Sequence, residues 1–413
     1  MGRLSVVVAG GYASTPSPAS HLLPAHPTFR ATGALSSLDA DPRILPSAPD
    51  QVKPSGASVP TFRATSALTT TPTRFLGPSF AFPRPGGTAI VLCMEGSPDN
   101  SEWTIGRLLD WTRGWLTSRG IEQPRLSAEL LLAHAVGRKR IDLYTRYESV
   151  PQASQVACFR ELVRRAGEHT PIAYLIGKKE FYSLEFEVTP AVLIPRPESE
   201  TLVERVADYC ARQGEDGWNC WDLGTGSGCL AVALCKQRPN LRCLATDVSA
   251  EAQEVAARNA ARHGLADRIR LAAADGFDVA PELAPADGFD LLMSNPPYVA
   301  DGDLARLAPA VRQYEPRVAL SAGPDGLRFY RLIAEQAPRW LRPGGAVFVE
   351  IGCGQEELVA DILTRDGSFA RAGTWRDAPG SHVRVLQFAL PTAARPGRSV
   401  VRGWQAEGSC RPR

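Results

Sequence analysis

The chain has 413 residues, of which 44% are apolar and 22% charged, with a formal net charge of +2. This composition is close to that of soluble globular proteins and allows two or three domains, so it excludes global disorder. No apolar run approaches the ~20 residues of a membrane-spanning helix, so we expect no membrane segment. The nine cysteines form no Cys-x-x-Cys pair, so we expect neither a metal site nor a disulfide framework.

Residues 1–100 are rich in Pro, Ser and Thr, contain only five acids, and show no sustained periodicity. We interpret them as a disordered extension. Residues 1–93 hold seven Lys/Arg and three Asp/Glu, so the other 320 residues hold 39 Lys/Arg and 41 Asp/Glu. The net charge of these 320 residues therefore does not favour nucleic acid binding. Met94 opens a sequence of globular composition. The first 93 residues are therefore either an over-extended start, with a cytoplasmic protein, or a transit segment to an organellar matrix.

Residues 101–175 are predicted to form a small helical domain that recognises the substrate. Its apolar residues recur with helical spacing. We place three helices at about 105–116, 127–137 and 153–166. The stretch from Met94 to Pro190 balances 13 basic with 13 acidic residues, which suggests a protein partner rather than phosphate.

Residues 176–197 are predicted to form a linking hairpin, with residues 180–188 as one alternating strand. From 198 to 390 helices and strands alternate, which is typical of an α/β fold with a doubly wound, mostly parallel sheet. We expect strands at 219–223, 241–247, 269–274, 289–294 and 346–351, and helices from 198 and at 228–237, 250–263, 327–341 and 355–364. A hairpin within 371–390 would add an antiparallel edge and complete seven strands. Residues 391–413 form a basic tail.

A glycine-rich loop, Trp221-Asp-Leu-Gly-Thr-Gly-Ser-Gly228, follows the first of these strands. Its glycines allow a sharp turn and the close approach of a ligand, and the amides at the next helix start favour an anionic group. The Gly-x-Gly-x-Gly spacing differs from the dinucleotide fingerprint, which disfavours NAD. Asp247 and Asp275 end the next two strands, where they can contact a ribose and an adenine. Both acids favour a nucleotide-like ligand over the alternative of an ordinary tight turn.

The tetrapeptide Asn295-Pro296-Pro297-Tyr298 follows the strand at 289–294. Its prolines remove two backbone donors and stiffen the turn, so the Pro296 carbonyl is a rigid acceptor. The Asn295 oxygen adds a second acceptor, and the two match the hydrogens of a planar NH2 group on which Tyr298 can stack. Such positioning contributes about 7 to 11 kcal/mol to catalysis, and no general base is needed before transfer. The alternative is that the tetrapeptide merely ends a strand.

Together these residues resemble the class I S-adenosylmethionine-dependent methyltransferases, whose Asn-Pro-Pro-Tyr subset acts on amino groups conjugated to planar systems. Further segments are similar to the peptide chain release factor glutamine methyltransferases, the HemK family. They are Pro171-Ile-Ala-Tyr-Leu-Ile-Gly177, Glu180-Phe-Tyr182 and Leu193-Ile-Pro-Arg-Pro-Glu-Ser-Glu200. The resemblance covers about residues 103–390. It implies that S-adenosyl-L-methionine is the cofactor and that the substrate is the glutamine amide in the Gly-Gly-Gln loop of class I release factors.

The resemblance also assigns roles to single residues. It gives the methionine end of the cofactor to Gly224, Thr225, Gly226, Ser227 and Gly228, the ribose to Asp247, and the substrate amide to Asn295, Pro296, Pro297 and Tyr298. Asn295, Pro296 and Tyr298 would be catalytic, with Asn295 also beside the cofactor. Where many relatives have an aromatic residue after Asp275, this chain has Gly276, so Phe277 could substitute at the adenine. Arg196, Glu198 and Glu200 either form a solvated helix start or shape the pocket mouth.

Three other functions stay open. A ribosomal-protein glutamine methyltransferase would use the same fold and tetrapeptide. An adenine methyltransferase acting on DNA would need base extrusion and a basic recognition domain, which the balanced charge of residues 94–190 disfavours. A non-catalytic cofactor-binding module is disfavoured by the intact Asn295. We expect the helical domain to hold the release factor, with no direct nucleic acid or membrane partner.

Overall fold

In a computed structural model of the protein, the structure describes residues 80–84, 87–92, 102–214, 217–377 and 382–392. The expectations for residues 1–79 and for most of the basic tail lie outside these described residues. Within the segment expected to be disordered, strands β1 (Phe80–Arg84) and β2 (Gly87–Leu92) pair antiparallel. These two strands lie within that segment, and the disorder of the extension as a whole stays a prediction. A Pro-Gly-Gly sequence beside an apolar run favours a hairpin too short for sustained periodicity to reveal.

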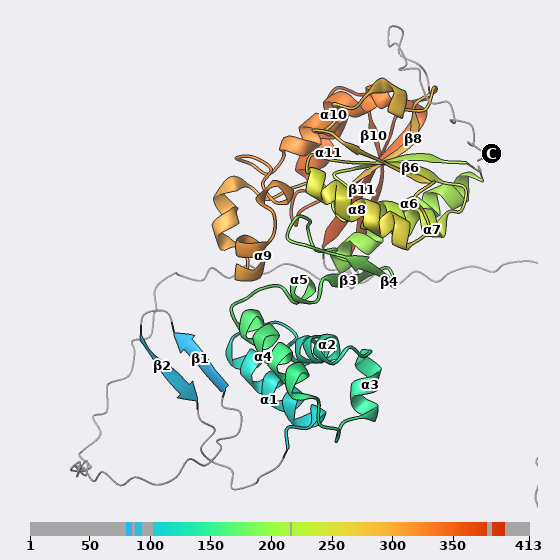
Figure 1. Ribbon diagram of the computed structural model, residues 1–413. Helices are drawn as coiled ribbons and strands as arrows, with labels where there is room; N and C mark the ends of the chain where they lie inside the picture. Colours follow the sequence, from blue (N-terminus) through green and yellow to red (C-terminus); the bar gives the residue numbers. More distant parts are fainter. Residues whose placement is uncertain (1–79, 85–86, 93–101, 215–216, 378–381, 393–413) are drawn as a thin grey trace, which may run out of the picture. The chain divides into compact units, whose positions relative to one another are not determined.

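The helical region contains the three predicted helices and two shorter ones (Figure 1). They are α1 (Ile105–Ser118), α2 (Pro124–Val136), α3 (Arg140–Thr145), α4 (Ala153–Gly167) and α5 (Ile172–Ile176). Their apolar faces form one core, in which Leu116, Leu131 and Leu132 are fully buried. Helices α3 and α5 were not predicted, because five or six residues are too few for helical spacing to stand out.

The linking hairpin consists of β3 (Lys178–Phe181) and β4 (Leu184–Glu187), paired antiparallel. The alternating stretch at 180–188 therefore spans parts of both arms, and the prediction of a single strand there was wrong. The turn lies at Tyr182 and Ser183, whose φ angles are 52° and 57°. Two consecutive residues with positive φ are typical of a tight hairpin turn. Because neither residue is glycine, no turn signal marks this point in the sequence.

The chain from β5 onward forms the predicted seven-stranded sheet, in the order β10-β11-β9-β8-β5-β6-β7. All neighbours are parallel except β11, which pairs antiparallel with β9 and β10. The strands are β5 (Asn219–Leu223), β6 (Arg242–Asp247), β7 (Ile269–Ala273), β8 (Phe289–Ser294), β9 (Leu341–Glu350), β10 (Ala370–Arg376) and β11 (Val383–Ala389). Strand β9 begins five residues before the predicted start, because Leu341 already pairs with Phe289.

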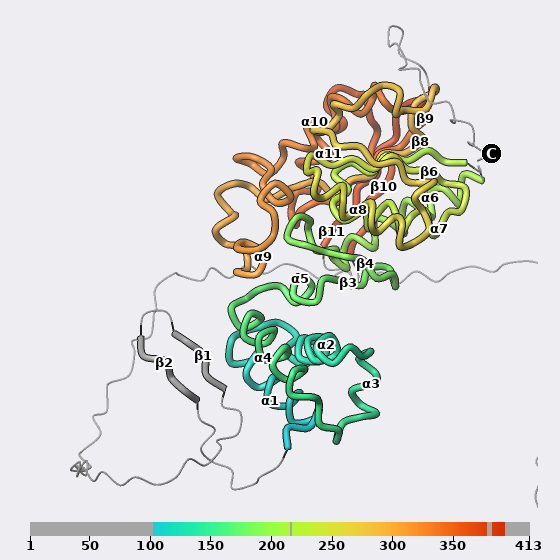
Figure 2. Tube along the Cα trace, viewed as in Figure 1, coloured from blue at the N-terminus to red at the C-terminus, as the bar shows by residue number. Residues whose placement is uncertain are grey.

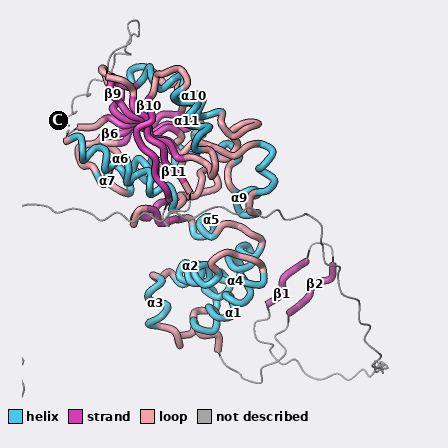
Figure 3. Tube along the Cα trace, turned by 180° about the vertical axis from the view of Figure 1, so that it is seen from behind, coloured by secondary structure: helices cyan, strands magenta, loops and turns pink. Residues whose placement is uncertain are grey.

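Helices cover both faces of this sheet, as the tubes in Figures 2 and 3 show from opposite sides. The core on one face includes residues of α6, α7 and α8, and the core on the other includes residues of α10 and α11. Neighbouring residues of one strand enter opposite cores, as Cys220 and Trp221 do. The helices are α6 (Glu200–Gln213), α7 (Cys229–Gln237), α8 (Ala250–Arg262), α9 (Pro309–Tyr314), α10 (Arg328–Trp340) and α11 (Glu356–Thr364). Short 3-10 turns lie at Pro197–Ser199, Pro281–Leu283, Asp301–Arg306 and Arg317–Ala319.

Candidate active site

The glycine loop and the tetrapeptide meet at the carboxyl ends of two central strands of the sheet. Strands β5 and β8 are parallel neighbours, with Asp222 opposite Met293. Their carboxyl ends are joined directly, because the Ser294 hydroxyl donates to the Leu223 carbonyl at 2.7 Å. The chain order also reverses here, since β6 follows on one side of β5 and β8 lies on the other. Ligands of doubly wound sheets bind at such a point, so the glycine loop and the tetrapeptide belong to one crevice.

The glycines of the loop serve two different purposes. Gly224, Gly226 and Gly228 have φ angles of 75°, 55° and 78°, a region that side chains rarely allow. A Cβ atom at Gly224 or Gly226 would meet nothing within 4 Å, whereas one at Gly228 would lie 3.2 Å from the Cβ of Ala256. The first two glycines therefore leave bare backbone open to a ligand. The third lets the start of α7 pack against α8.

Asp247 links the end of β6 to the glycine loop. One carboxylate oxygen accepts a hydrogen bond from the amide of Gly226 at 2.8 Å, and the other accepts from the amide of Ser249 at 3.0 Å. Burial raises the pKa of this carboxyl, and the two amides oppose the rise. A carboxylate can accept about four hydrogen bonds, so capacity remains for ribose hydroxyls. The ribose role of Asp247 stays a prediction.

The predicted adenine contacts lie after β7. Asp275 is exposed and Gly276 is partly exposed. Phe277 is only 8% exposed, and its ring centroid lies 5.1 Å from that of the buried Trp221. The structure therefore places much of the Phe277 ring in the core beneath the sheet edge. Its substitution for an aromatic adenine contact stays a prediction, and the packing against Trp221 leaves little of the ring for that role.

The acid that precedes the loop, Asp222, is fully buried. One carboxyl oxygen accepts from the Thr225 hydroxyl at 2.6 Å. The other is buried without a hydrogen-bond partner among the described residues. Burial raises the pKa of Asp222 to about 7, and the bond from Thr225 opposes that rise. The sequence placed an acid before the loop but gave no sign of this burial.

The raised pKa of Asp222 predicts how stability changes with pH. Between an unfolded pKa of about 4 and a folded pKa of about 7 the folded chain holds more protons, so the free energy of unfolding falls as pH rises through this window. Glu350, whose pKa burial also raises to about 7, adds to the fall. We expect Asp222→Asn to reduce this pH-dependent loss of stability without abolishing it. Urea unfolding at about pH 5 and pH 8 measures the free energy of unfolding at each pH, and the exposed Asp267→Asn serves as control. If the difference between the two pH values is the same in Asp222→Asn as in wild type, the prediction is contradicted.

The tetrapeptide lines a pocket of about 320 Å³. The side-chain nitrogen of Asn295 donates to the Ser199 hydroxyl at 3.0 Å, which leaves the amide oxygen as an acceptor. Pro296 and Tyr298 line the same pocket, and Pro297 is not among its lining residues. The carbonyl of Tyr298 accepts from the Gln355 side chain at 3.0 Å. The structure thus brings three of the four predicted substrate residues to one cavity.

The pocket has a polar end and an apolar wall. The polar end contains Arg196, Glu198, Asn295, Glu350 and Arg384. The remaining lining residues are Leu193, Pro296, Tyr298, Val299, Leu307, Val311, Ala319 and Leu320. Much of the apolar wall comes from residues 299–320, which follow the tetrapeptide. This wall carries no motif, so sequence reasoning did not find it.

The three residues whose roles were open separate into two groups. Arg196 donates to both carboxylate oxygens of Glu315, at 2.6 and 2.8 Å, and the Glu315 side chain is 1% exposed. Glu198 lines the pocket. Glu200 instead accepts from the backbone amide of Tyr182 at 2.8 Å and so anchors the linking hairpin. The pocket-mouth alternative therefore fits Arg196 and Glu198, and Glu200 has a structural contact elsewhere.

The residues that the structure describes contain neither a candidate metal cluster nor a candidate membrane-spanning helix. No group of three or more His, Cys, Asp or Glu side chains among those residues could hold a metal ion. Within the same residues, no helix has both the length and the apolar character needed to cross a membrane.

Comparisons with known proteins give consistent matches. The sequence model of the PrmC N-terminal domain matches residues 107–177, and that of the methyltransferase small domain matches residues 199–310. A release factor glutamine methyltransferase from Geobacter sulfurreducens is 43% identical over 278 residues, which are 67% of this chain and 94% of that protein. One from Rhodopirellula baltica is 38% identical over 298 residues, which are 71% of this chain and 99% of that protein.

Among solved structures, the release factor-specific protein-(glutamine-N5) methyltransferase of Alicyclobacillus acidocaldarius is 29% identical and covers 50% of this chain and 99% of that chain, with a TM-score of 0.30. The family of this chain follows from the two sequence relatives and not from this structural similarity.

Proposed function

Because the chain belongs to the family of release factor glutamine methyltransferases, we propose that it methylates the glutamine of the Gly-Gly-Gln motif in class I peptide chain release factors. The methyl group comes from S-adenosyl-L-methionine and goes to the side-chain amide nitrogen. One observation carries the proposal. The side-chain nitrogen of Asn295 donates to Ser199, which leaves the amide oxygen as an acceptor at a pocket that Asn295, Pro296 and Tyr298 line. Such a pocket suits a flat carboxamide.

The residues of the glycine loop fit the cofactor. Space is open at Gly224 and Gly226, and Asp247 stands at the end of the neighbouring strand. The Gly224–Gly228 loop, including Thr225 and Ser227, would hold the methionine end, and Asp247 would hold the ribose. Asp275, Gly276 and the exposed part of Phe277 would border the adenine. When bound, S-adenosyl-L-methionine supplies the activated methyl carbon.

The chain's own residues orient the substrate. The Asn295 oxygen and the Pro296 carbonyl would each accept one hydrogen of the glutamine NH2 group, and Tyr298 would stack on the amide plane. Two fixed acceptors in that plane leave the nitrogen lone pair perpendicular to it, facing the cofactor side. Such positioning lowers the activation barrier for methyl transfer because the translational and rotational entropy of the reacting groups is already lost on binding. The nitrogen sheds a proton after its positive charge has formed, so no base is required before transfer.

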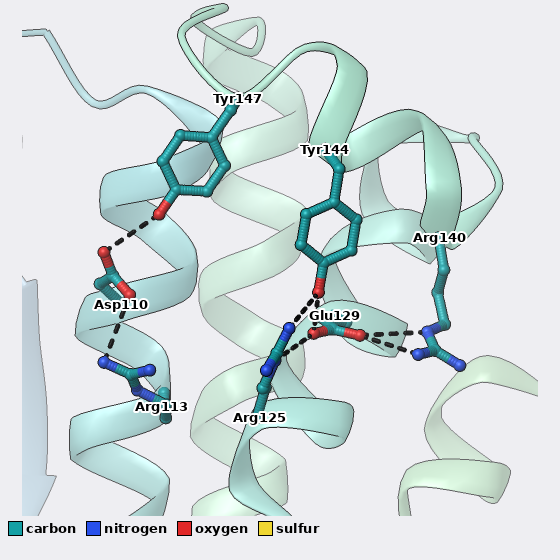
Figure 4. A network of polar contacts seen from close by, with 7 residues as sticks. All are labelled: Asp110, Arg113, Arg125, Glu129, Arg140, Tyr144 and Tyr147. Carbon is teal, nitrogen blue, oxygen red and sulfur yellow. Dashed lines mark hydrogen bonds and ion pairs between the residues drawn. The ribbon is translucent and has the colours of Figure 1, made fainter.

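A patch on the helical region supports binding of a protein substrate. It consists of Ile141, Tyr144, Tyr147 and Val150, which are 66%, 43%, 37% and 47% exposed. We call these four residues the α3 patch. Figure 4 shows that polar contacts fix both tyrosines: Tyr144 bonds to Glu129, which Arg125 and Arg140 also contact, and Tyr147 donates to Asp110. The four exposed residues fall within ten consecutive positions of the sequence, and contiguous exposed apolar residues mark interaction surfaces.

Basic residues outnumber acidic ones near the α3 patch. Arg138, Lys139, Arg140 and Arg146 are exposed and lie close to it or within it in the sequence, and Arg125 donates to the Tyr144 hydroxyl, against the acids Asp142 and Glu148. A partner surface with apolar residues and an acidic rim would match this arrangement. We propose that the release factor docks here while its glutamine enters the pocket.

We expect Ile141→Asp to raise the KM for a release factor about 10-fold, because a charge replaces an exposed apolar contact. The kcat should stay unchanged, since the α3 patch does not line the catalytic pocket. Steady-state kinetics measure both parameters. Leu358→Asp is the matched control, because Leu358 is equally apolar and 54% exposed on α11. An unchanged KM, or an equal rise in both variants, would show that the partner docks elsewhere.

The function is tested by supplying methyl-labelled cofactor with a release factor, a ribosomal protein or duplex DNA, and locating the label by peptide mass. We expect label on the Gly-Gly-Gln glutamine. Label only on the ribosomal protein or on DNA would support the alternatives and overturn the proposal. Action in the cytoplasm, or in an organellar matrix if residues 1–93 are a transit segment, stays a prediction.

A further inference from the structure

The polar end of the pocket contains two charged side chains from one short turn, Arg196 and Glu198. The turn spans Pro197–Ser199, and the amide of Ser199 donates to the Arg196 carbonyl at 3.1 Å, which closes it. The side-chain nitrogen of Asn295 donates to the Ser199 hydroxyl at 3.0 Å. The turn therefore lies against the tetrapeptide, and both charged residues line the same pocket as Asn295.

Arg196 has donors left after its ion pair is formed. Its Nη2 atom donates to both carboxylate oxygens of Glu315, at 2.6 and 2.8 Å. A guanidinium group has five N–H donors, so the three on Nε and Nη1 remain, and no acceptor among the described residues takes a hydrogen bond from them. The Arg196 side chain is 32% exposed and lines the pocket. Arg196 therefore offers N–H groups to a ligand while a buried carboxylate holds its other side.

Glu198 supplies a carboxylate without a counter-ion. Its side chain lines the pocket and is half-buried, and within the described part of the chain it takes part in no hydrogen bond or ion pair. Neither arginine of the polar end is paired with it, because Arg196 pairs with Glu315 and Arg384 pairs with Asp377. A carboxylate that leaves water needs new donors. A ligand that fills this end of the pocket must therefore bring N–H or O–H groups to Glu198.

The chemistry of the Gly-Gly-Gln motif matches this pair of groups. Two glycines precede the glutamine, and glycine has no side chain. An enzyme that contacts this part of its substrate through hydrogen bonds can use only the backbone, which offers one N–H donor and one C=O acceptor per residue. A carboxylate can accept from such an N–H, and a guanidinium can donate to such a carbonyl.

We propose that Arg196 and Glu198 form a subsite for the peptide backbone next to the substrate glutamine. Glu198 accepts a hydrogen bond from a backbone N–H of the substrate, and Arg196 donates to a backbone carbonyl. This inference rests on the proposed function and adds a second region of contact beside the carboxamide pocket. It also favours a peptide over a nucleic acid, because the unpaired Glu198 carboxylate would repel a phosphate group.

The first test removes the Glu198 carboxylate. We expect Glu198→Ala to lower kcat/KM for an intact release factor about 10- to 100-fold, the effect of losing a hydrogen bond to a charged group. Glu198→Gln keeps one acceptor oxygen and should lose less. The Kd of the cofactor should not change. Glu282→Ala is the matched control, because Glu282 is exposed and also follows proline in a 3-10 turn, Pro281–Leu283. A Glu198→Ala variant with the kcat/KM of wild type would overturn the proposal.

The second test removes the N–H partner from the substrate. Intact release factors are assembled by peptide ligation with an N-methyl group on one backbone nitrogen at a time, at either glycine, at the glutamine and at the residue after it. With wild-type enzyme, we expect at least one of these substrates to lose about 10- to 100-fold in kcat/KM. With Glu198→Ala the same substrate should lose almost nothing further, because the two partners of one bond are not additive. Losses that multiply for all four substrates would overturn the proposal.

The third test concerns Arg196. In Arg196→Lys the ammonium group can still pair with Glu315, but it has one nitrogen in place of the planar fork. We expect kcat/KM for the unmodified release factor to fall about 10-fold. A thioamide at the contacted carbonyl accepts hydrogen bonds poorly, so it should cost wild type more than the lysine variant. Equal costs in both enzymes would overturn the role of Arg196 in the subsite.

The outcomes separate the subsite from the proposed function. If wild-type enzyme labels no release factor, the proposed function fails. If it labels the Gly-Gly-Gln glutamine and the effects of Glu198→Ala and of N-methylation multiply, only the subsite fails. The Glu198 experiments decide this whether or not Arg196→Lys folds, because the Glu198 side chain bonds to no other side chain in the described part of the chain.

Discussion

Asn295→Ala is expected to lower kcat for a release factor by about 100- to 1000-fold, the effect of deleting one preorganised hydrogen-bonding group from an active site. Alanine removes the side-chain oxygen that would hold one substrate hydrogen, and only the Pro296 carbonyl is left. The lone pair of the glutamine nitrogen then loses its fixed direction. Transfer of labelled methyl measures kcat, and calorimetry with the cofactor should show a Kd close to that of wild type.

The matched control for this variant is Asn240→Ala. Asn240 is exposed and lies just before β6, at the opposite end of that strand from the site. It should keep full turnover. If Asn295→Ala also kept its turnover, the tetrapeptide would not be the substrate site, and the chain's activity would have to be assigned to another part of the crevice.

Asp247→Ala is expected to raise the Kd of the cofactor about 100-fold. Each hydrogen bond from a ribose hydroxyl to a carboxylate contributes about 1.5 to 3 kcal/mol, and two of them at the lower end correspond to roughly that factor. The variant also frees the amide of Gly226, which Asp247 holds at 2.8 Å, so the loop loses an anchor. Calorimetry measures the Kd, and thermal unfolding checks that the fold is intact.

Two further variants separate these effects. Asp247→Asn keeps one acceptor oxygen and should weaken binding less than alanine does. Asp267→Ala serves as the control, because Asp267 is exposed and lies before β7, away from the carboxyl ends of the strands. Cofactor affinity that is the same in Asp247→Ala and wild type would refute the assignment of the ribose to Asp247.

The parts of the fold that could be predicted are those with a strong local pattern. Strands β5 to β9 were predicted because apolar runs alternate with helical spacing along this part of the chain, and β10 and β11 were predicted as a hairpin at the sheet edge. The elements that were missed or misassigned are short or lack a turn signal. Helix α3 has six residues, and the turn at Tyr182 and Ser183 adopts positive φ without glycine. There the contact of Glu200 with the Tyr182 amide helps to hold the turn, and such a contact leaves no trace in the local sequence.

The site shows the same division. The glycine loop and the tetrapeptide each carry their chemistry in consecutive residues, so both were found. Ser199 and Asn295 are 96 residues apart, and their contact depends on how the sheet brings strand ends together. Glu350 sits at the end of an apolar strand, where the sequence gives no sign that its carboxyl is buried beside the pocket. Sequence patterns therefore located the tetrapeptide and missed both Ser199, which contacts Asn295, and the buried Glu350, which lines the same pocket.

The ion pair between Arg196 and Glu315 has a consequence for how the enzyme is completed during synthesis. Its partners are 119 residues apart, and the segment that contains Glu315 forms much of the apolar wall. A nascent chain that has emerged only to residue 300 would already carry the glycine loop and the tetrapeptide, yet it would lack one side of its substrate cavity. Competence for methyl transfer should therefore be acquired late in translation, after the parts needed for cofactor binding have emerged.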